Sequence, residues 1–394
     1  MTGLPEADFY GFESLLTATE AAKLAQLRGF LAGEVAPHAT GWWNDAEFPA
    51  HILPGLAALG LAVPDRRHFS HLFTGLVVAE MTRTDTSLAT FFLVHHDLFV
   101  QALIDFGSQD QKERLLPDAI ALRTTGAFAL TEPEHGSDVA GGMATTARRV
   151  EDGAGATHWV LNGAKRWIGN GTFCNHMMLW AKDADTGAVR AFILDASLPG
   201  VTRTKIENKI ALRTVQNAHI LLDDVRVEER DRFSGIGSFA DTNKLLRSSR
   251  ISVAWQAVGQ QLAAFDVARA YAVERRQFGK PLASFQLIQG QLVKMLGNAT
   301  SSLAMMVRIA ALQDAGGDAD ATMAQVALAK AHTTAAMRET VAMGRAILGG
   351  NGIVTDYRMA KIFADAEAIY TYEGSQEVNT LIAGRAVTGI SAIV

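Results

Sequence analysis

Residues 177–194 read MMLWAKDADTGAVRAFIL and contain the clearest strand pattern in the chain. Two apolar runs, Met177–Trp180 and Ala191–Leu194, have the length of β-strands, and Asp183–Gly187 between them is typical of a hairpin loop. Further short apolar runs, separated by Gly, Asn and Asp, occur at Trp159–Leu161 and Ile220–Leu222. Because no helical pattern of ten residues stands between these strands, we expect an antiparallel sheet rather than a parallel α/β sheet.

Helical patterns flank this region on both sides. Before it, apolar residues recur at spacings of three and four from Leu24 to Leu31 and from Leu88 to His95. After it, apolar stripes begin at Ile251 and Phe285, and an Ala-rich helix covers residues 320–348 before a short fourth helix. We therefore expect an α+β fold of three domains: an N-terminal helical domain (1–125), a central antiparallel β domain (126–235) and a C-terminal four-helix bundle (236–394).

Composition narrows the classes of function. Of the 394 residues, 48% are hydrophobic and 20% are charged, and the net charge of −5 disfavours a nucleic-acid partner, which needs a basic surface. The single cysteine, Cys174, excludes a disulfide within the chain and a cysteine-based metal site. Residues Met1–Glu13 do not resemble a secretory signal, and no long apolar run predicts a membrane span. We expect a cytoplasmic protein, or an organelle-matrix protein in a eukaryote.

Four motifs carry residues suited to cofactor and substrate chemistry. They are LTEPEHGSD at Leu130–Asp138, KRWIGN at Lys165–Asn170, RRQFGKP at Arg275–Pro281 and YTYEGSQ at Tyr370–Gln376. Amides and hydroxyls in the first motif can donate hydrogen bonds to the carbonyl oxygens of a cofactor. Guanidinium groups in the third motif can donate paired hydrogen bonds to phosphate. The fourth motif contains Glu373, whose carboxylate is a candidate general base.

In their order and spacing, these regions and motifs resemble the acyl-CoA dehydrogenase family from about residue 20 to the C-terminus. The resemblance is closest to the glutaryl-CoA dehydrogenase branch, through TYEG at Thr371–Gly374 and GRAVTG at Gly384–Gly389. It implies FAD as the cofactor, an acyl-CoA substrate and a role in fatty acid metabolism. It further implies an electron-transfer flavoprotein as the electron acceptor and a homotetramer formed as a dimer of dimers.

The resemblance also implies the cofactor contacts. Phe128–Ser137 would line the flavin ring and the acyl-CoA entrance, and Trp167 would pack on the flavin with Gly169 near N5, where the family usually has Thr. Arg275 would bind the flavin pyrophosphate of a neighbouring subunit, opposite the glycines of residues 346–350, which permit close backbone approach. The implied cofactor-binding residues are Phe128, Leu130, Thr131, Gly136, Ser137, Trp167, Ile168, Gly169, Arg275, Phe278, Gln286, Ala346, Leu348, Gly349, Gly350 and Ser375.

The catalytic residue implied by the resemblance is Glu373. Its carboxylate would remove the proton alpha to the thioester on the face opposite the flavin, while its backbone N–H and a flavin ribityl hydroxyl bind the thioester oxygen. Gly374 would flank the substrate and Ser375 the flavin, and either residue can also open the helix that follows. Glu377, one turn on, is interpreted as helix-end charge. The implied substrate-binding residues are Ser137, Ala89, Leu93, Arg250 and Gly374.

The chain departs from glutaryl-CoA dehydrogenases where those enzymes bind the distal carboxylate of their substrate. They use a Glu, an Arg and a Ser placed around an Arg-x-Asp pattern, which is Arg83–Asp85 here. The corresponding residues of this chain are Thr82, Ala89 and Leu93. An apolar pocket would leave a buried carboxylate without a partner, at a high cost in free energy. We therefore predict a neutral acyl chain, short to medium or branched, and no decarboxylation.

Other interpretations stay open at this point. A glutaryl-CoA dehydrogenase, an acyl-CoA oxidase and a dehydrogenase of a carrier-protein thioester would carry the same motifs. A flavin-bearing nucleic-acid-binding protein is the non-enzymatic alternative, and the negative net charge disfavours it. His68, His71 and the pair His95–His96 lack the neighbouring carboxylates or cysteines of a metal site, so we predict no metal.

Overall fold

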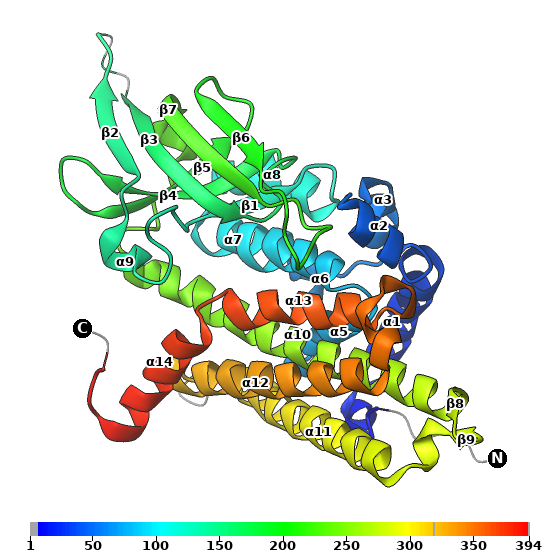
Figure 1. The fold of residues 1–394 in the computed structure, drawn as a ribbon. Coiled ribbons are helices and arrows are strands. Elements are labelled where there is room, and N and C mark those ends of the chain that lie inside the picture. Colours follow the sequence, from blue (N-terminus) through cyan, green and yellow to red (C-terminus); the bar gives the residue numbers. More distant parts are fainter. Residues whose placement is uncertain (1–6, 154, 156, 318–319, 393–394) are drawn as a thin grey trace.

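The computed structural model describes residues 7–392 except 154, 156, 318 and 319. Two helical regions pack against each other, and a sheet domain lies against one side of them (Figure 1). In the N-terminal region, α6, η4 and α7 join into one continuous helix. The helices of this region are η1 (Phe12–Leu15), α1 (Ala18–Phe30), η2 (Leu31–Val35), α2 (Ala39–Asp45), η3 (Ala50–Ile52), α3 (Leu53–Ala58), α4 (Val63–Arg66), α5 (His71–Thr84), α6 (Thr86–Phe92), η4 (Leu93–Val100), α7 (Gln101–Phe106) and α8 (Gln109–Ile120).

The sheet domain contains the predicted hairpin. β4 and β5 pair antiparallel, with Met177 opposite Leu194, and residues 184–188 form the loop between them. Met178 faces a core shared with α7 and α8, whereas Leu179 faces a core within the sheet domain, so both faces of β4 are buried and its sequence is continuously apolar. The elements are β1 (Gly126–Ala129), α9 (Val139–Gly142), β2 (Thr146–Glu151), β3 (Thr157–Ile168), β4 (His176–Asp183), β5 (Val189–Asp195), β6 (Val201–Lys205), β7 (Ala218–Glu228) and η5 (Glu229–Asp231).

The sheet is mixed, which corrects the expectation of a purely antiparallel sheet. The strand order is β1-β4-β2-β3-β7-β6, with β5 on β4. β4 pairs parallel with β1, Gly126 opposite His176, and parallel with β2, Thr146 opposite Lys182. The other pairings of this sheet are antiparallel. Strands joined by a short hairpin must run antiparallel, whereas the long connection between β1 and β4 leaves their relative direction free.

The C-terminal region is a helical bundle, as predicted, but it has one helix more than expected. Residues 359–371 form a separate helix, α13, and the predicted short fourth helix is α14, which projects from the bundle beside the C-terminus (Figure 1). The elements are α10 (Phe239–Glu274), β8 (Arg276–Gln277), β9 (Lys280–Pro281), η6 (Leu282–Ser284), α11 (Gln286–Ala315), α12 (Met323–Ile347), η8 (Gly349–Ile353), η9 (Thr355–Tyr357), α13 (Met359–Thr371) and α14 (Gln376–Thr388).

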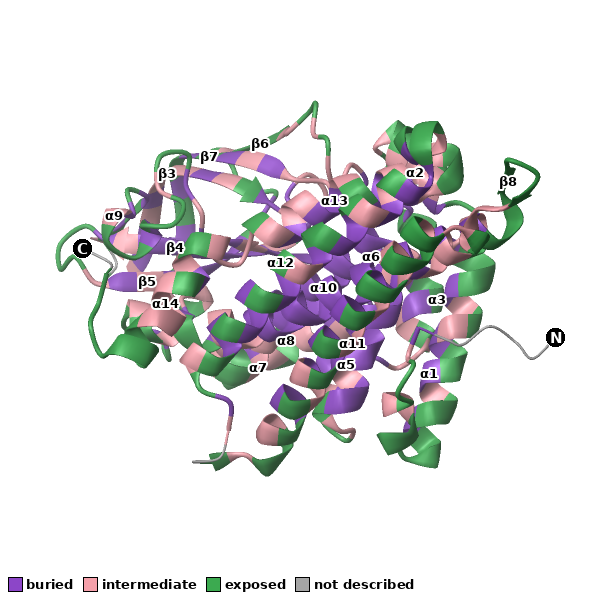
Figure 2. Ribbon diagram, turned by 60° about the horizontal axis from the view of Figure 1, so that its bottom comes forward, coloured by how far each residue is buried: buried purple, intermediate pink, exposed green. Residues whose placement is uncertain are grey.

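The two helical regions share one hydrophobic core, and α10 runs through its centre (Figure 2). Glycines on α5 and α10 bring these helices close together. A Cβ atom at Gly75 would lie 2.0 Å from Trp255, and one at Gly259 would lie 2.2 Å from the carbonyl oxygen of Ala79. Any larger residue at either position would therefore push the helices apart.

Two helices of the described chain are long and apolar enough to cross a bilayer by length and composition. In the first, Thr86–Phe106, 83% of the most apolar window is buried inside the fold, so burial accounts for its composition. In the second helix, α11, 44% of the most apolar window is buried, on the face that packs against α10 and α12. That no segment crosses a membrane stays a prediction.

Candidate active site

Glu373 lies in the tight turn between α13 and α14. α13 ends at Thr371, and Ser375 caps the N-terminus of α14 by accepting a hydrogen bond from the backbone N–H of Val378. Between them, Glu373 and Gly374 have left-handed backbone conformations, with φ of 55° and 83°. This conformation costs a non-glycine residue of the order of 1 kcal/mol, so surrounding contacts must hold Glu373 in it. The prediction that Ser375 opens a helix is confirmed.

Two neighbouring residues of α10 hold Glu373. The hydroxyl of Ser249 donates to the carboxylate Oε2 at 2.5 Å, and the Nε–H of Arg250 donates to the backbone carbonyl of Glu373 at 3.2 Å. Burial lowers the pKa of Arg250, and the nearby carboxylate of Glu373 opposes that shift. The guanidinium also reaches the sulfur of Met323. Arg250, predicted from the resemblance, therefore lies beside the candidate base, whereas none of the four motifs pointed to Ser249.

A second residue of the site that lies outside the four motifs is Lys330 on α12. Its side chain is fully buried, and its ammonium group donates to the carbonyls of Tyr372, at 2.6 Å, and of Gly374. Burial lowers the pKa of Lys330 to about 7 even though Glu373 stabilises its charge. A lysine on the apolar stripe of an Ala-rich helix was the signal that could have revealed it.

The segments predicted to line the flavin lie side by side in the sheet domain. The backbone N–H of Arg166 donates to the carbonyl of Thr131 at 2.8 Å. Lys165, fully buried, joins the same two segments by donating to the carbonyl of Leu130 and to Glu132. Trp167, beyond this junction, keeps 52% of its surface exposed and has φ of 63°. The exposed indole of Trp167 in one segment, and the exposed Gly136 and Ser137 in the other, suit the flat, apolar ring and the polar edge of a flavin.

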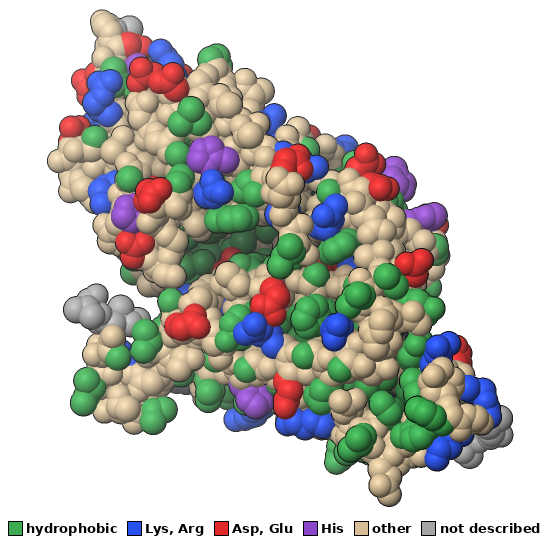
Figure 3. All heavy atoms as spheres, in the orientation of Figure 1, with side chains coloured by type: hydrophobic (Ala, Val, Ile, Leu, Met, Phe, Trp, Pro, Cys, Tyr) green, Lys and Arg blue, Asp and Glu red, His purple; other side chains and the backbone are tan. Residues whose placement is uncertain are grey.

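Short contacts link these segments to Glu373 across η4. A Cβ atom at Gly169 would lie 3.1 Å from Val94, so the end of β3 touches η4. One turn along η4, Asp97 accepts a hydrogen bond from Ser252 at 2.7 Å, and Ser252 is one turn from Ser249 on α10. The fold thus brings the sheet segments and the carboxylate to the junction of sheet and bundle, where Figure 3 shows a hollow lined by hydrophobic side chains.

The predicted pocket positions are buried in the described structure. Thr82, Ala89 and Leu93 are each 2% exposed, and the Thr82 hydroxyl donates to the carbonyl of Val78 in its own helix. The Thr82 hydroxyl is therefore occupied within α5, and Ala89 and Leu93 present only apolar side chains. The hydroxyl of Tyr372 donates to Gln256 of α10, another residue outside the four motifs.

Arg275, Gln286 and residues 346–350 meet at the opposite end of the bundle. Arg275 follows the C-terminus of α10, Gln286 begins α11, and Leu348 follows the C-terminus of α12. Arg275 and Gln286 are exposed, and Phe278, in the β8–β9 hairpin between them, is 91% exposed. At 1.5 Å per helical residue, Arg250 and Arg275 are about 37 Å apart along α10. The fold therefore does not bring this group to the Glu373 of its own chain.

Other polar clusters have structural explanations. His95 joins η4 to its neighbours, through the carbonyl of Ala119 at 2.8 Å and the N–H of Gly126 at 2.9 Å, and burial lowers its pKa to about 4.

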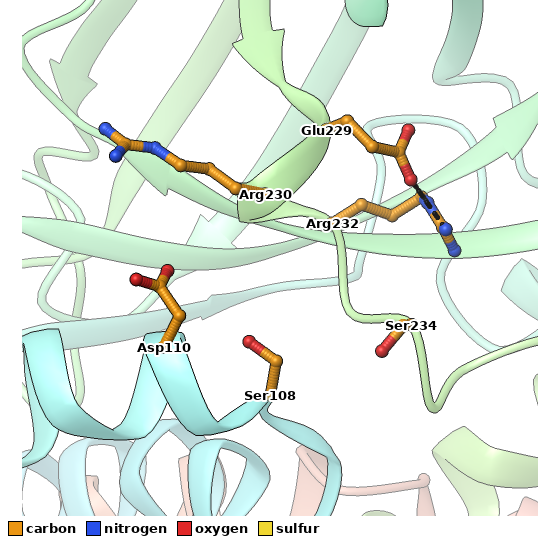
Figure 4. Close-up of a pocket in the computed structure, with 6 residues that line it drawn as sticks. All are labelled: Ser108, Asp110, Glu229, Arg230, Arg232 and Ser234. Atoms are coloured by element: carbon orange, nitrogen blue, oxygen red, sulfur yellow. Dashed lines mark hydrogen bonds and ion pairs between the residues drawn. The ribbon is translucent and has the colours of Figure 1, made fainter.

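A surface depression of about 310 Å³ between α8 and η5 is shown in Figure 4; Arg232 pairs with Glu229 there, and none of the four motifs contributes to it. The described residues contain no group of three or more His, Cys, Asp or Glu side chains placed to hold a metal ion.

Comparison with known proteins identifies the family. The models of the acyl-CoA dehydrogenase N-terminal, middle and C-terminal domains match residues 17–123, 127–225 and 239–388. This chain belongs to the acyl-CoA dehydrogenase family. The family resemblance, the fold and the oxidoreductase class predicted from the sequence are thereby confirmed.

Individual members of the acyl-CoA dehydrogenase family match nearly the whole chain. The human mitochondrial short-chain specific acyl-CoA dehydrogenase is 30% identical over 93% of this chain and 89% of its own length. The caffeyl-CoA reductase-Etf complex subunit CarC of Acetobacterium woodii is 30% identical over 86% and 90%. A glutaryl-CoA dehydrogenase structure from Mycobacterium smegmatis has a TM-score of 0.93 and 31% identity, covering 99% of this chain and 100% of its own, and another from that organism, with a TM-score of 0.92 and 28% identity over the same shares, is a complex with FADH2.

Proposed function

We propose that this chain is an FAD-dependent acyl-CoA dehydrogenase that removes hydrogen from the alpha and beta carbons of a neutral acyl thioester. The observation that carries the proposal is the position of Glu373. Its carboxylate lies in a fixed turn held by Ser249 of α10, and contacts through η4 connect α10 to the segments suited to a flavin. Family membership and the FADH2 complex of a structural relative support the cofactor.

In this proposal the side chains of the turn perform the proton chemistry. The Glu373 carboxylate accepts the alpha proton, and the Ser249 hydroxyl, 2.5 Å away, orients it. The backbone N–H of Glu373 binds the thioester oxygen and stabilises the negative charge that develops there. FAD, when bound, supplies the acceptor for the hydride of the beta carbon. The Trp167 ring and the segment 128–137 would hold the flavin and exclude water.

The acyl chain is proposed to be short to medium or branched, without a carboxylate at its end. Thr82, Ala89 and Leu93 are buried and offer no cation to such a group. This feature separates the chain from glutaryl-CoA dehydrogenases, even though one of them is among its structural relatives. Decarboxylation is therefore not part of the proposed reaction.

The proposed partners are an electron-transfer flavoprotein and further copies of this chain in the cytoplasm or an organelle matrix. The first follows from the Etf complex named for one relative. The second follows from the distance between Arg275 and Glu373, because a guanidinium that binds flavin pyrophosphate there must serve the site of a neighbouring subunit. We propose a homotetramer.

The experiment is anaerobic bleaching of the bound flavin by acyl-CoA esters of increasing length and branching. Wild-type protein should bleach with at least one ester, and Glu373→Gln should slow bleaching at least 1,000-fold because the base is lost. Glu377→Gln is the matched control, since it removes an exposed carboxylate from the first turn of α14 and should retain the wild-type rate. Failure of every ester, or equal rates in the two variants, contradicts the proposed function.

The same preparations separate the alternatives. Glutaryl-CoA bleaching the flavin as fast as butyryl-CoA would indicate a carboxylate-binding pocket. Rapid reoxidation of the substrate-reduced flavin by air would indicate an oxidase. Bleaching by a carrier-protein thioester but by no CoA ester would indicate that the acyl group is bound to a carrier protein instead of CoA. A shift in the mobility of DNA would support the non-enzymatic alternative.

A further inference from the structure

Lys330 is a buried charge to which the proposed reaction assigns no role. It projects from α12 into the turn that carries Glu373, and it has no surface exposure. The charges of Arg250 on α10 and Glu373 in the turn act on it, and so, from the surface of α14, does the charge of the exposed Glu377. A buried ammonium ion costs free energy that an apolar side chain of similar size would not, so packing alone does not explain a lysine at this position.

The contacts of Lys330 belong to a larger pattern in the turn. Three successive backbone carbonyls are occupied by side chains from the bundle: that of Tyr372 by Lys330, that of Glu373 by Arg250, and that of Gly374 by Lys330 and Asn379. Asn379 is also fully buried. A Cβ atom at Gly374 would lie 3.1 Å from Asn379, so the turn is packed closely on these donors.

Occupied carbonyls determine where the amides of the turn point. Every described peptide bond is trans, so the N–H of a peptide unit points opposite to its carbonyl. The carbonyl of Tyr372 points at Lys330 on α12, and the N–H of Glu373, in the same peptide unit, therefore points away from α12. The N–H groups of Glu373, Gly374 and Ser375 have no acceptor among the described residues.

We propose that Lys330 is a positioning residue for the thioester site: by binding the carbonyls of Tyr372 and Gly374, it aims the N–H of Glu373 at the substrate carbonyl oxygen and holds the carboxylate of Glu373 toward the alpha carbon. This role rests on the proposed function. Because a fixed donor stabilises a developing oxyanion without reorganising during the reaction, rigidity of the turn contributes directly to the acidity of the bound substrate.

The test measures that acidity with acetoacetyl-CoA, whose alpha proton is acidic and whose enolate gives a long-wavelength charge-transfer band with oxidised flavin. The pH at which the band appears should rise by about two units in Lys330→Met, and bleaching by the best acyl-CoA of the wild-type panel should slow by about 100-fold, the effect of losing one oxyanion donor. Lys330→Arg, which keeps the positive charge and can donate two hydrogen bonds, should bring both the pH at which the band appears and the bleaching rate most of the way back to wild type.

The matched control is Lys361→Met, which removes another buried ammonium ion of the bundle, paired with Asp85 and Asp365. It should lower Tm and leave the enolisation pH unchanged, which separates positioning from general stability. Lys330→Met with full flavin content and the wild-type band overturns the inference. If that variant does not fold, Lys330→Gln replaces it, and an unshifted band in every folded variant overturns the inference equally. A wild-type protein that gives neither a band nor bleaching contradicts the proposed function instead.

Discussion

Buried charges hold the loops on both sides of the candidate site. In the sheet domain, Glu132 accepts from Lys165 at 2.8 Å and from the backbone N–H groups of Ala144 and Thr145. Burial alone would raise the pKa of Glu132, but Lys165 and the amides lower it to about 2. Burial lowers the pKa of Lys165 to about 8 despite its partner. The pair ties the flavin-lining segment 128–137 to β3.

Replacing Glu132 by Gln tests this pair at the residue scale. The lowered pKa means that the Glu132 carboxylate stabilises the fold fully above its ordinary pKa of 4.5 and loses that effect as the pH falls toward 2. Urea unfolding at pH 7 should therefore show Glu132→Gln to be about 3 kcal/mol less stable than wild type, since Lys165 stays buried without its counter-charge. The difference should shrink between pH 4.5 and 2. A difference that does not change with pH would contradict the assignment.

At the scale of elements, the break between α13 and α14 creates the site. Continuing α13 by two turns would give residue 373 helical dihedrals and occupy its amides in the helix. Instead, Tyr372 is extended, Glu373 and Gly374 are left-handed, and Ser375 starts a new helix. The break frees three amides and holds the carboxylate against Ser249 of α10.

Ser375→Ala should weaken α14 without affecting other helices. Loss of an N-cap side chain costs about 1 kcal/mol, so the amides of the first turns of α14 should exchange hydrogen about five times faster. Hydrogen exchange on flavin-free protein isolates this effect from any contact of Ser375 with the cofactor. Ser108→Ala, which removes the cap of α8, should speed exchange in α8 alone. Unchanged exchange in α14 would show that packing on α12 alone holds the helix.

At the scale of the molecule, one buried carboxylate connects all three regions of the chain. Asp365 of α13 accepts from the indole N–H of Trp43 at 2.8 Å, from the backbone N–H of Leu212 at 2.6 Å, and from Lys361 at 3.0 Å. Lys361 also pairs with Asp85, which caps α6. This cluster joins the N-terminal helices and the loop before β7 to the bundle.

Asp365→Asn should destabilise the whole protein, because Lys361 loses one of its two buried counter-charges and one of the donors loses its acceptor. We expect a loss of about 3 kcal/mol in the free energy of unfolding, seen by calorimetry as a lower Tm. Asp314→Asn is the control: Asp314 pairs with His71 at the surface and should change stability by less than about 1 kcal/mol. Equal effects of the two substitutions would contradict a central role for Asp365.

Assembly is tested at the same scale by comparing two neighbouring arginines. Arg275→Ala should lower flavin content at least tenfold in purified protein if the side chain serves a neighbouring subunit, since a charged hydrogen bond to phosphate is lost. Arg276 donates to the carbonyl of Gly279 within its own hairpin, so Arg276→Ala should retain its flavin. Light scattering should give the mass of a tetramer for wild type. A monomer with full flavin content would contradict the cross-subunit role.

Local patterns in the sequence are sufficient to predict several main helices, the central hairpin and the family of this molecule. Strand-length runs with turn residues predict the β4–β5 hairpin, and apolar spacing predicts α1, α10 and α11, because both depend on residues close together in the chain. Motifs with fixed spacing predict the family and point to Glu373 and Trp167, and the family resemblance adds Arg250. These patterns lie within short segments, so they can be recognised in the sequence without knowing how the chain folds.

Tertiary structure alone shows how distant segments meet. The parallel pairing of β1 with β4, the hydrogen bond from Ser249 to Glu373 and the burial of Lys330 beneath the turn each join residues more than 40 positions apart. No local periodicity encodes such contacts: a lysine on the apolar stripe of α12 indicates burial, but it does not show that the carbonyls of Tyr372 and Gly374 are its partners. Once Lys330 is buried, hydrogen bonds must compensate its charge, because only in the interior must every backbone carbonyl and every ion find a partner.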